Sequence, residues 1–323
     1  MRGAAIAMAI GIIGCGGSGI NPRALPAIEP IGLISAQTYT DKTAGLRATL
    51  ARSDVGFDSV PVIRSCYGFA DRYCLRCEVA TREDTRGIDP EMIDGVAIAF
   101  ARYPTSVLAA GKLEHVALCR SIRYDDKRDG APAGVAISSE HRLLISIEGF
   151  VDRPHDVYDY FTIEQVVHHE LFHLIDRETF GATAESDTEW LALNPSGFEY
   201  RDPAESSSER RRGFVNTYAT TSQVEDRASV FEYLMGQPEK LCTIAEADPV
   251  VAAKTAVIWK RMATIVGEEL LQRHAACVGW IETKAAGTAQ LPKQLGPQPA
   301  GQPQRGEQSP TLPRKRTILG KMR

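Results

Sequence analysis

The segment 163–176 constrains the fold of this chain more than any other stretch of its sequence. Its apolar residues recur at helical spacing, which predicts a half-buried helix that ends near Gly181. Within it, His169, Glu170 and His173 form the pattern H-E-x-x-H. Residues four apart lie about 40° apart around a helix axis, so the two imidazoles project side by side.

This pair of histidines has the arrangement that a zinc ion requires. Two imidazoles on adjacent turns can share one Zn²⁺, and Glu170 then lies where a general base would take a proton from water. We therefore expect a zinc-dependent hydrolase, specifically a peptidase, with one catalytic Zn²⁺. The alternative is a buried helix whose histidines bond backbone carbonyls. His168 is about 100° from His169 around the helix, which favours a supporting or surface position.

A catalytic zinc site usually has three protein ligands, so the sequence must supply a third. The extended pattern H-E-x-x-H-x-x-G-x-x-H requires Gly at position 176 and His at position 179. Those positions hold Asp176 and Thr179, which excludes that extension. A carboxylate on a second helix is the better candidate, because four other histidines stand in no recognisable ligand spacing: His115, His141, His155 and His274.

A second helix is expected from about residue 223 to residue 235. Thr221 or Ser222 is a suitable N-cap, and Glu225 stands in the capping-box position after Ser222. An apolar stripe with spacings of four, three and four then runs to Met235, and Glu225 lies beside it. Glu225 is therefore either a metal ligand or a capping carboxylate that never contacts a metal.

Together the two segments resemble the catalytic domain of the anthrax lethal factor-like metallopeptidases, among the zincins with a glutamate ligand. The resemblance covers about 70 residues, 163–235, and is strongest at the two helices. It includes an Asp three residues after the second His and a Tyr seven residues before the Glu. The matching residues are His169, Glu170, His173, Asp176, Tyr218, Glu225, Ala228, Phe231 and, shifted by about one position, Leu234 and Met235.

The resemblance implies a role for each matching polar residue. Glu225 would be the third zinc ligand, Tyr218 would donate a hydrogen bond to the oxyanion of the tetrahedral intermediate, and Asp176 would orient a zinc-bound imidazole. Two positions depart: Phe172 stands where family members can carry a small residue, and Arg227 stands where the toxin has an aromatic. No segment corresponds to the toxin's substrate-docking domains, so its specificity does not transfer.

The surrounding sequence predicts a sheet that leads into the motif helix. Segments 114–119, 133–137 and 142–147 have the composition of strands, and 90–110 is expected to be helical with a break near Pro104. We expect an α+β, zincin-like metallopeptidase domain, with a small mixed sheet packed on the active-site helix and a helical lower subdomain. The resemblance implies an edge strand that pairs with substrate, and we assign it to the region 133–148; ordinary core sheet is the alternative.

The segment between the two expected metal helices contains turn signals and aromatic residues. Residues 190–200 include the dipeptides Asn-Pro and Ser-Gly, which favour an ordered loop. This loop either covers the cleft and forms substrate subsites or is anchored on the core by Trp190.

Both ends of the chain differ in composition from its middle. Residues 1–14 carry a short apolar run before Cys15, which is typical of a lipoprotein signal peptide; Cys15 would then be the lipidated N-terminus, and a simple secretory signal is the alternative. We expect a tether at 15–55, the zinc metallopeptidase domain at 56–282 and a disordered tail, rich in Pro and Gln and basic at its end, at 283–323. The predicted location is the bacterial cell envelope, with the protein anchored in the membrane by its lipid.

The cysteines agree with export. Of the 7 in the chain, six remain after Cys15, and an even number in an exported protein predicts disulfides with 15 possible pairings. Cys74 and Cys77, with Cys66, could alternatively form half of a structural zinc site.

The net charge of the chain excludes few classes of function. The value of −4 gives no indication of nucleic-acid binding, and we expect a monomer that acts on a peptide or protein substrate. The rival interpretation is a non-catalytic cell-envelope lipoprotein that uses a zincin scaffold for binding or for structural zinc.

Overall fold

The structure of the full chain is a computed structural model. Every residue that it describes falls within one unit, Met1–Ala289. The described residues are 36–67, 73–82, 88, 90–125, 132–147, 162–181, 187–200 and 212–266. The expected signal peptide with Cys15, the first part of the expected tether, the end of the expected domain and the expected tail all lie outside them.

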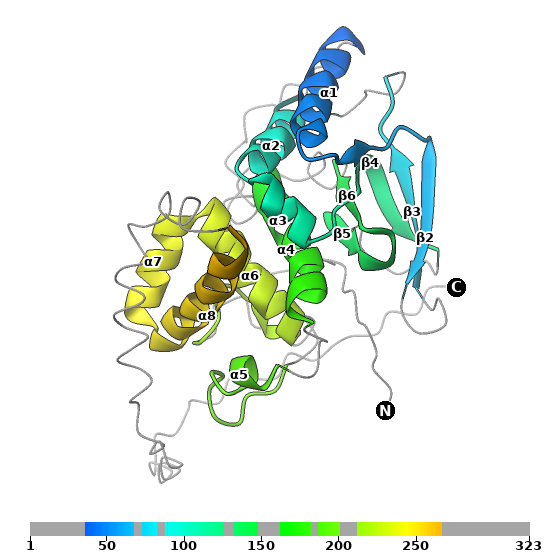
Figure 1. The fold of residues 1–323 in the computed structure, drawn as a ribbon. Helices are drawn as coiled ribbons and strands as arrows, with labels where there is room; N and C mark the ends of the chain where they lie inside the picture. The colour runs from blue at the N-terminus through cyan, green and yellow to red at the C-terminus, as the bar shows by residue number, and fades with distance from the viewer. Residues whose placement is uncertain are drawn as a thin grey trace, which may run out of the picture. The chain divides into compact units, whose positions relative to one another are not determined.

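A mixed sheet of six strands forms one side of the described part of the molecule (Figure 1). The order is β2-β3-β4-β6-β5, with β1 paired to β4 off this path. Strands β4 and β6 run parallel, while β5 is antiparallel to β6 and ends the order. The strands are β1 (Gly56–Phe57), β2 (Val62–Tyr67), β3 (Tyr73–Val79), β4 (His115–Tyr124), β5 (Gly134–Ile137) and β6 (Arg142–Ser146).

Helix α4 lies between this sheet and a group of C-terminal helices (Figure 1). It contacts β5 and β6 on one side and α6 on the other, so the predicted α+β architecture with a motif helix under a small mixed sheet is confirmed. The helices are α1 (Ala36–Ala51), α2 (Pro90–Ala101), α3 (Thr105–Ala110), α4 (Ile163–Phe180), α5 (Thr188–Leu191), α6 (Gln223–Gly236), α7 (Pro238–Ala247) and α8 (Pro249–Val266).

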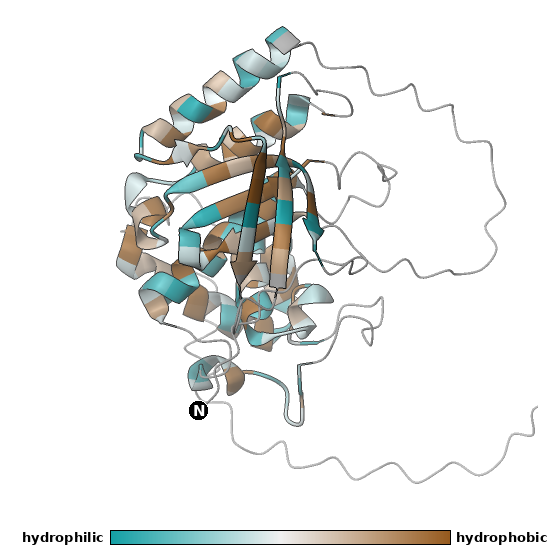
Figure 2. Cartoon of the chain, turned by 90° about the vertical axis from the view of Figure 1, so that its right-hand side faces the viewer, coloured by the Kyte–Doolittle hydropathy of each residue, from teal (hydrophilic) through white to brown (hydrophobic). Residues whose placement is uncertain are grey.

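The sheet buries apolar side chains on both faces, and these alternate along each strand as pleating requires. On β4, Val116 and Leu118 join the core formed with the helices, whereas Ala117 and Cys119 belong to a second buried cluster on the other face. Figure 2 shows hydrophobic and hydrophilic residues interspersed along the strands. The strands predicted at 114–119, 133–137 and 142–147 correspond to β4, β5 and β6, and the predicted break near Pro104 separates α2 from α3.

Both ends of α4 are set by local sequence. The Thr162 hydroxyl accepts from the Gln165 N–H, and the Gln165 side chain accepts from the Thr162 N–H, which completes a capping box. At the other end Gly181 adopts φ 58°, a left-handed conformation that costs glycine little, and the helix ends at Phe180 as predicted.

Close packing brings α6 against α4. A Cβ added to Gly236 would lie 2.9 Å from Cγ of Gln165, so the small residue allows the end of α6 to approach the start of α4. At the start of α6 the Ser222 side chain accepts from the Glu225 N–H at 3.3 Å, which identifies Ser222 as the N-cap. The candidate metal ligands are Glu225 on the first turn of α6, and His169 and His173 in the middle of α4.

Part of the segment expected to be a tether is folded. Helix α1 occupies 36–51, inside the expected tether of 15–55, and its Leu46 and Leu50 are fully buried. It packs on α2, and the Tyr39 hydroxyl donates to the Ala80 carbonyl at 2.7 Å. Folded structure therefore begins at or before residue 36, ahead of the boundary predicted at residue 56, because α1 buries Leu46 and Leu50 in the core.

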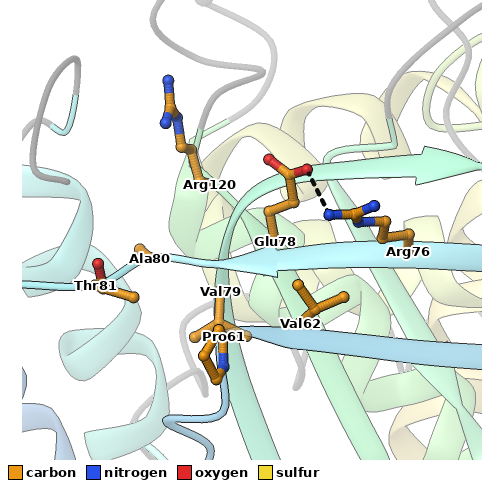
Figure 3. A pocket seen from close by; sticks show the side chains of 8 residues that line it. All are labelled: Pro61, Val62, Arg76, Glu78, Val79, Ala80, Thr81 and Arg120. Carbon is orange, nitrogen blue, oxygen red and sulfur yellow. Dashed lines mark ion pairs between the residues drawn. The ribbon is translucent and has the colours of Figure 1, made fainter.

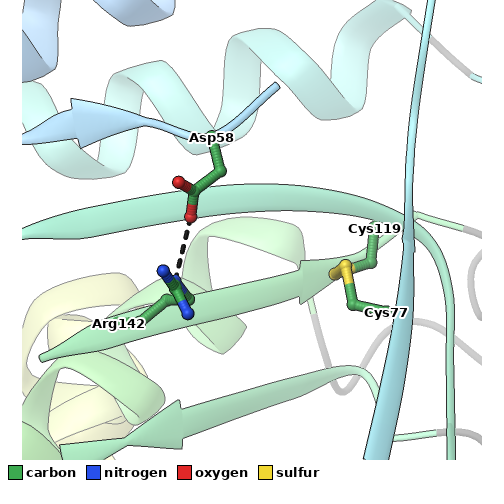
Figure 4. Close-up of a disulfide and its surroundings, with 4 residues drawn as sticks. All are labelled: Asp58, Cys77, Cys119 and Arg142. Carbon is green, nitrogen blue, oxygen red and sulfur yellow. Dashed lines mark hydrogen bonds and ion pairs between the residues drawn. A yellow bond between two sulfur atoms is a disulfide. The ribbon is translucent and has the colours of Figure 1, made fainter. Parts of the chain in front are cut away.

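The predicted disulfides are confirmed for two pairs. Cys66 bonds Cys74, and Cys77 bonds Cys119 across neighbouring strands β3 and β4 (Figure 4). The alternative of a half zinc site at Cys74 and Cys77 is therefore wrong, because both thiols are oxidised. Closing the 42-residue separation between Cys77 and Cys119 stabilises the fold by roughly 4 kcal/mol on the chain-entropy model. Cys242 is also disulfide-bonded.

An ion pair ties the segment after β1 to β6. Arg142 Nε lies 2.9 Å from Asp58 Oδ2 (Figure 4). Arg142 begins β6 and is paired in register with His115 at the start of β4. Among the described residues, no helix has both the length and the apolar character needed to cross a membrane.

Candidate metal centre

Three side chains predicted to hold a metal converge between α4 and α6. His169 Nε2 lies 2.8 Å from Glu225 Oε2, and His173 Nε2 lies 3.3 Å from the same oxygen. The two imidazole rings are 4.8 Å apart between centroids. One ligand atom from each of the three residues falls within 4.8 Å of the others. Two imidazole nitrogens and one carboxylate oxygen are a donor set that suits Zn²⁺.

The centre is reached from solvent on the side of His173. Its side chain is 18% exposed, whereas those of His169 and Glu225 are 1% exposed. Burial alone would raise the pKa of Glu225, but the charges and hydrogen bonds of His173 and His169 hold it below its ordinary value. Glu225 is therefore an ionised carboxylate, the form that binds a cation.

Glu170 belongs to α4, and its side chain lies against the edge strand β5. It is buried, and burial raises the pKa of its carboxyl above the ordinary value, although His173 and His169 partly offset this. The backbone N–H of Ala136 donates to the carboxylate. A Cβ added to Gly134 would lie 2.7 Å from Cγ and 3.1 Å from Oε1 of Glu170, so this glycine leaves the space that Glu170 occupies.

Tyr218 stands beside the centre at the start of a short 3-10 helix, Tyr218–Thr220. Its ring centroid lies 5.7 Å from that of His169, and its hydroxyl is hydrogen-bonded to Glu225. Burial, followed by the negative charges of Glu225 and Glu170, raises its pKa well above the ordinary value. Tyr218 thus stays a protonated hydrogen-bond donor throughout the physiological pH range.

The residue expected to orient an imidazole makes a different contact. Asp176 Oδ2 accepts from Arg227 Nε at 2.8 Å and lies 2.7 Å from Arg227 Nη2. Its Oδ1 has no hydrogen-bond partner among the described residues, so neither oxygen bonds a histidine. Asp176 therefore does not orient an imidazole in this structure: its carboxylate forms a buried ion pair with the guanidinium of Arg227, a position at which the toxin has an aromatic.

Glu232 takes the orienting position instead. Its Oε2 lies 3.0 Å from His169 Nδ1 and accepts the ring hydrogen, while its Oε1 accepts from Gln165 Nε2 at 2.9 Å. Glu232 is two helical turns after Glu225, so the same face of α6 reaches both nitrogens of His169. The spacing of seven residues was the available signal in the sequence, and it was not recognised.

A buried network next to Glu225 anchors the loop between the two metal helices. Asp226 Oδ2 accepts from Trp190 Nε1 at 2.9 Å, from the Tyr200 hydroxyl at 2.9 Å and from Lys254 Nζ at 2.6 Å. Trp190 is fully buried. Of the two interpretations of residues 190–200, the structure supports the loop anchored on the core.

The remaining histidines lie away from the centre or outside the described residues. His168 is buried beside α2, and its Nδ1 lies 2.6 Å from the Tyr103 hydroxyl, which places it in a supporting position. His115 and His141 lie at the start of β4 and before β6, near Asp58 and Glu114 respectively. His155 and His274 lie outside the described residues.

Comparisons with known proteins add little to this geometry. No family model matches the chain, and no curated protein matches it. Among solved structures, the chain is similar to a candidate zinc-binding metallo-peptidase from Bacteroides caccae, at 17% identity and a TM-score of 0.35, over 77% of this chain and 96% of that one. A likeness this distant carries no argument about activity, so the resemblance to lethal factor-like enzymes rests on the residues of this sequence.

Proposed function

We propose that this protein is a zinc-dependent metallopeptidase of the glutamate-zincin type. The observation that carries the proposal is the convergence of His169, His173 and Glu225 around one point, with the buried Glu170 on the adjacent turn. When bound, a zinc ion would polarise a peptide carbonyl and lower the pKa of water. A purely structural zinc site needs no general base, and Glu170 is the feature that favours catalysis.

The chain's own groups have distinct tasks in this proposal. Glu170 accepts a proton from the attacking water and passes it to the leaving amine; its raised pKa suits a group that must both take and give a proton near neutral pH. Tyr218 donates to the oxygen on which negative charge develops, so its contribution belongs to the transition state. Glu232 holds His169 in one orientation through Nδ1.

Strand β5 is the surface on which we expect an extended substrate to pair. It ends the strand order of the sheet, and its first residue, Gly134, contacts the general base. An added strand would gain main-chain hydrogen bonds and bring its scissile peptide past Glu170. The substrate class is therefore an extended peptide or an unfolded segment of a protein.

We also propose that the protein is exported and held at the bacterial cell envelope by a lipid on Cys15. Two disulfides among the described residues support an oxidising compartment. The test is labelling of the full chain with a radioactive fatty acid in cells, with Cys15→Ser as the control variant. Equal labelling of both proteins would contradict lipidation at Cys15.

The function is tested by comparing Glu170→Gln with the wild-type chain on a diverse peptide library. Glu170→Gln should keep one equivalent of zinc and lose nearly all cleavage, because the amide cannot accept the proton. Tyr218→Phe should lower kcat and leave zinc content intact. Stoichiometric zinc with no cleavage by the wild-type chain would instead favour the rival function, a non-catalytic envelope protein on the same scaffold.

A further inference from the structure

Gln165, in the first turn of α4, joins the start of that helix to the candidate metal centre. Its side chain is 0% exposed, so its amide must find its hydrogen bonds within the protein. A Cβ added to Gly236 would approach the Cγ of Gln165 to 2.9 Å, which places the end of α6 directly against this side chain. The amide is therefore held between the two helices that carry the candidate ligands.

Three hydrogen bonds fix the orientation of this amide. Its Oε1 accepts from the backbone N–H of Thr162 at 3.0 Å and from Nε2 of Gln237 at 3.0 Å. Its own Nε2 donates to Glu232 Oε1 at 2.9 Å. Reversing the amide would set its NH2 group against the N–H of Thr162. A backbone N–H is always a donor, so the reversed amide is excluded and Nε2 must face Glu232.

The fixed amide determines how Glu232 bonds His169. One carboxylate oxygen of Glu232 receives a hydrogen from Gln165, and the other lies 3.0 Å from His169 Nδ1. A carboxylate accepts at both oxygens, so the ring hydrogen of His169 is held at Nδ1. The nitrogen left for a metal is Nε2, which lies on the side of Glu225. This is the nitrogen that the candidate centre requires.

We propose that Gln165 is a positioning residue of the metal centre, which acts through Glu232 to hold the ring hydrogen of His169 at Nδ1. The inference rests on the proposed function, because it takes His169 as a metal ligand. Either Glu or Gln at this position completes a capping box, since the cap uses only the side-chain oxygen. The donor on Nε2 is what distinguishes glutamine, and in this structure Glu232 receives it.

The first comparison separates positioning from capping. Gln165→Met removes the amide and keeps an unbranched side chain. Thr162→Ala removes the hydroxyl that accepts from the Gln165 N–H at 3.3 Å, but it leaves the backbone N–H that orients the amide. Both variants should unfold at lower urea concentrations without zinc. In a chelator competition, Gln165→Met should bind zinc about tenfold or more weakly, whereas Thr162→Ala should bind it like the wild-type chain.

A reciprocal exchange tests the direction of the hydrogen bonds. In Glu232→Gln alone, Gln165 Nε2 faces the new amide oxygen, so the new NH2 group faces His169 Nδ1 and drives the ring hydrogen to Nε2. In the double variant Gln165→Glu, Glu232→Gln, the amide at position 232 donates to the carboxylate at position 165 and again accepts from Nδ1. The double variant should therefore bind zinc about tenfold more tightly than Glu232→Gln alone.

The control for the loss of a carboxylate is Glu78→Gln on strand β3. Glu78 pairs with Arg76 and lines a cavity of about 200 Å³ that shares no residue with the candidate centre (Figure 3). Because it makes the same chemical change as Glu232→Gln away from the ligands, this variant should bind zinc like the wild-type chain.

Two results would overturn the inference. Equal zinc affinity of Gln165→Met and Thr162→Ala would assign Gln165 to capping alone. A double variant that binds zinc no more tightly than Glu232→Gln would show that the direction of these hydrogen bonds does not select the ligand nitrogen. Peptide cleavage by the wild-type chain is measured separately, so a failure of the proposed peptidase activity is distinguishable from a failure of this inference.

Discussion

Replacing Lys254 with methionine should strongly destabilise the domain. The Lys254 ammonium lies 2.6 Å from Asp226 Oδ2 and 2.8 Å from the Gly213 carbonyl, and both side chains of the ion pair are 0% exposed. Methionine keeps much of the apolar stem, so the change removes mainly the charge. The carboxylate of Asp226 would then be buried with two neutral donors, from Trp190 and Tyr200.

The expected loss follows from the cost of a buried, unpaired charge. Breaking a buried ion pair by removing one partner costs about 3–5 kcal/mol of unfolding free energy. Burial raises the pKa of Asp226 and lowers that of Lys254, so each charge is already disfavoured by its loss of water. Removing both charges, in Asp226→Asn with Lys254→Met, should therefore recover part of the loss, with a coupling energy of about 2 kcal/mol.

Urea unfolding of the zinc-free proteins, followed by tryptophan fluorescence, measures these differences. The control is Lys260→Met, an exposed lysine on the same helix α8, which should change the stability by less than about 0.5 kcal/mol. If Lys254→Met cost less than about 1 kcal/mol, or if the double variant were simply additive, the ion pair would not hold the loop between the metal helices as we argue.

Three further predictions concern the candidate centre. Gly134→Ala should lower kcat by about tenfold to a hundredfold with zinc content unchanged, because its Cβ would displace Glu170; loss of zinc instead would contradict this. Glu232→Gln should weaken zinc binding by about 10–100-fold in a chelator competition, and an unchanged affinity would remove its orienting role. Burial opposes the charge on His169, yet Glu225 and Glu232 raise its pKa above the ordinary value, so protons compete with zinc. Zinc affinity should therefore fall as pH is lowered, with proton release on binding by calorimetry in two buffers; a pH-independent affinity would contradict this.

The sequence was sufficient to locate the motif helix and its C-terminal end. The H-E-x-x-H pattern, the apolar spacing around it and Gly181 are local signals, and local signals survive in the fold. Glu225 was also identified as a candidate metal ligand, although its position after Ser222 allowed a second interpretation as a capping carboxylate. The structure brings only its backbone N–H to the cap, while its carboxylate lies against the two histidines, which is the position of a metal ligand and not of a capping carboxylate.

The partners of the buried charges could not be read from the sequence. Asp176 stands three residues after His173, the spacing of an orienting carboxylate, but its carboxylate pairs with Arg227, 51 residues later. Glu232 reaches His169 from another helix, and the distance between the two depends on how closely α6 packs on α4. Such contacts are set by tertiary packing, and the spacing of residues within one segment carries no information about how two segments pack.

Two other features were missed for similar reasons. Helix α1 has a weakly patterned sequence and is helical because it packs on α2, so its own composition gave no signal. The pairing of β3 with β4, and with it the bond between Cys77 and Cys119, depends on contacts between distant segments. Six cysteines allow 15 pairings, and only the fold selects among them.

The central claim is that His169, His173 and Glu225 hold a catalytic zinc ion, with Glu170 as the base. The most direct test measures zinc content and peptide cleavage together for the wild-type chain and for Glu225→Ala. We predict one equivalent of zinc and chelator-sensitive cleavage in the wild-type chain, with both lost in the variant. Full zinc content in Glu225→Ala would contradict the ligand set, and cleavage that persists without zinc would contradict the proposed function.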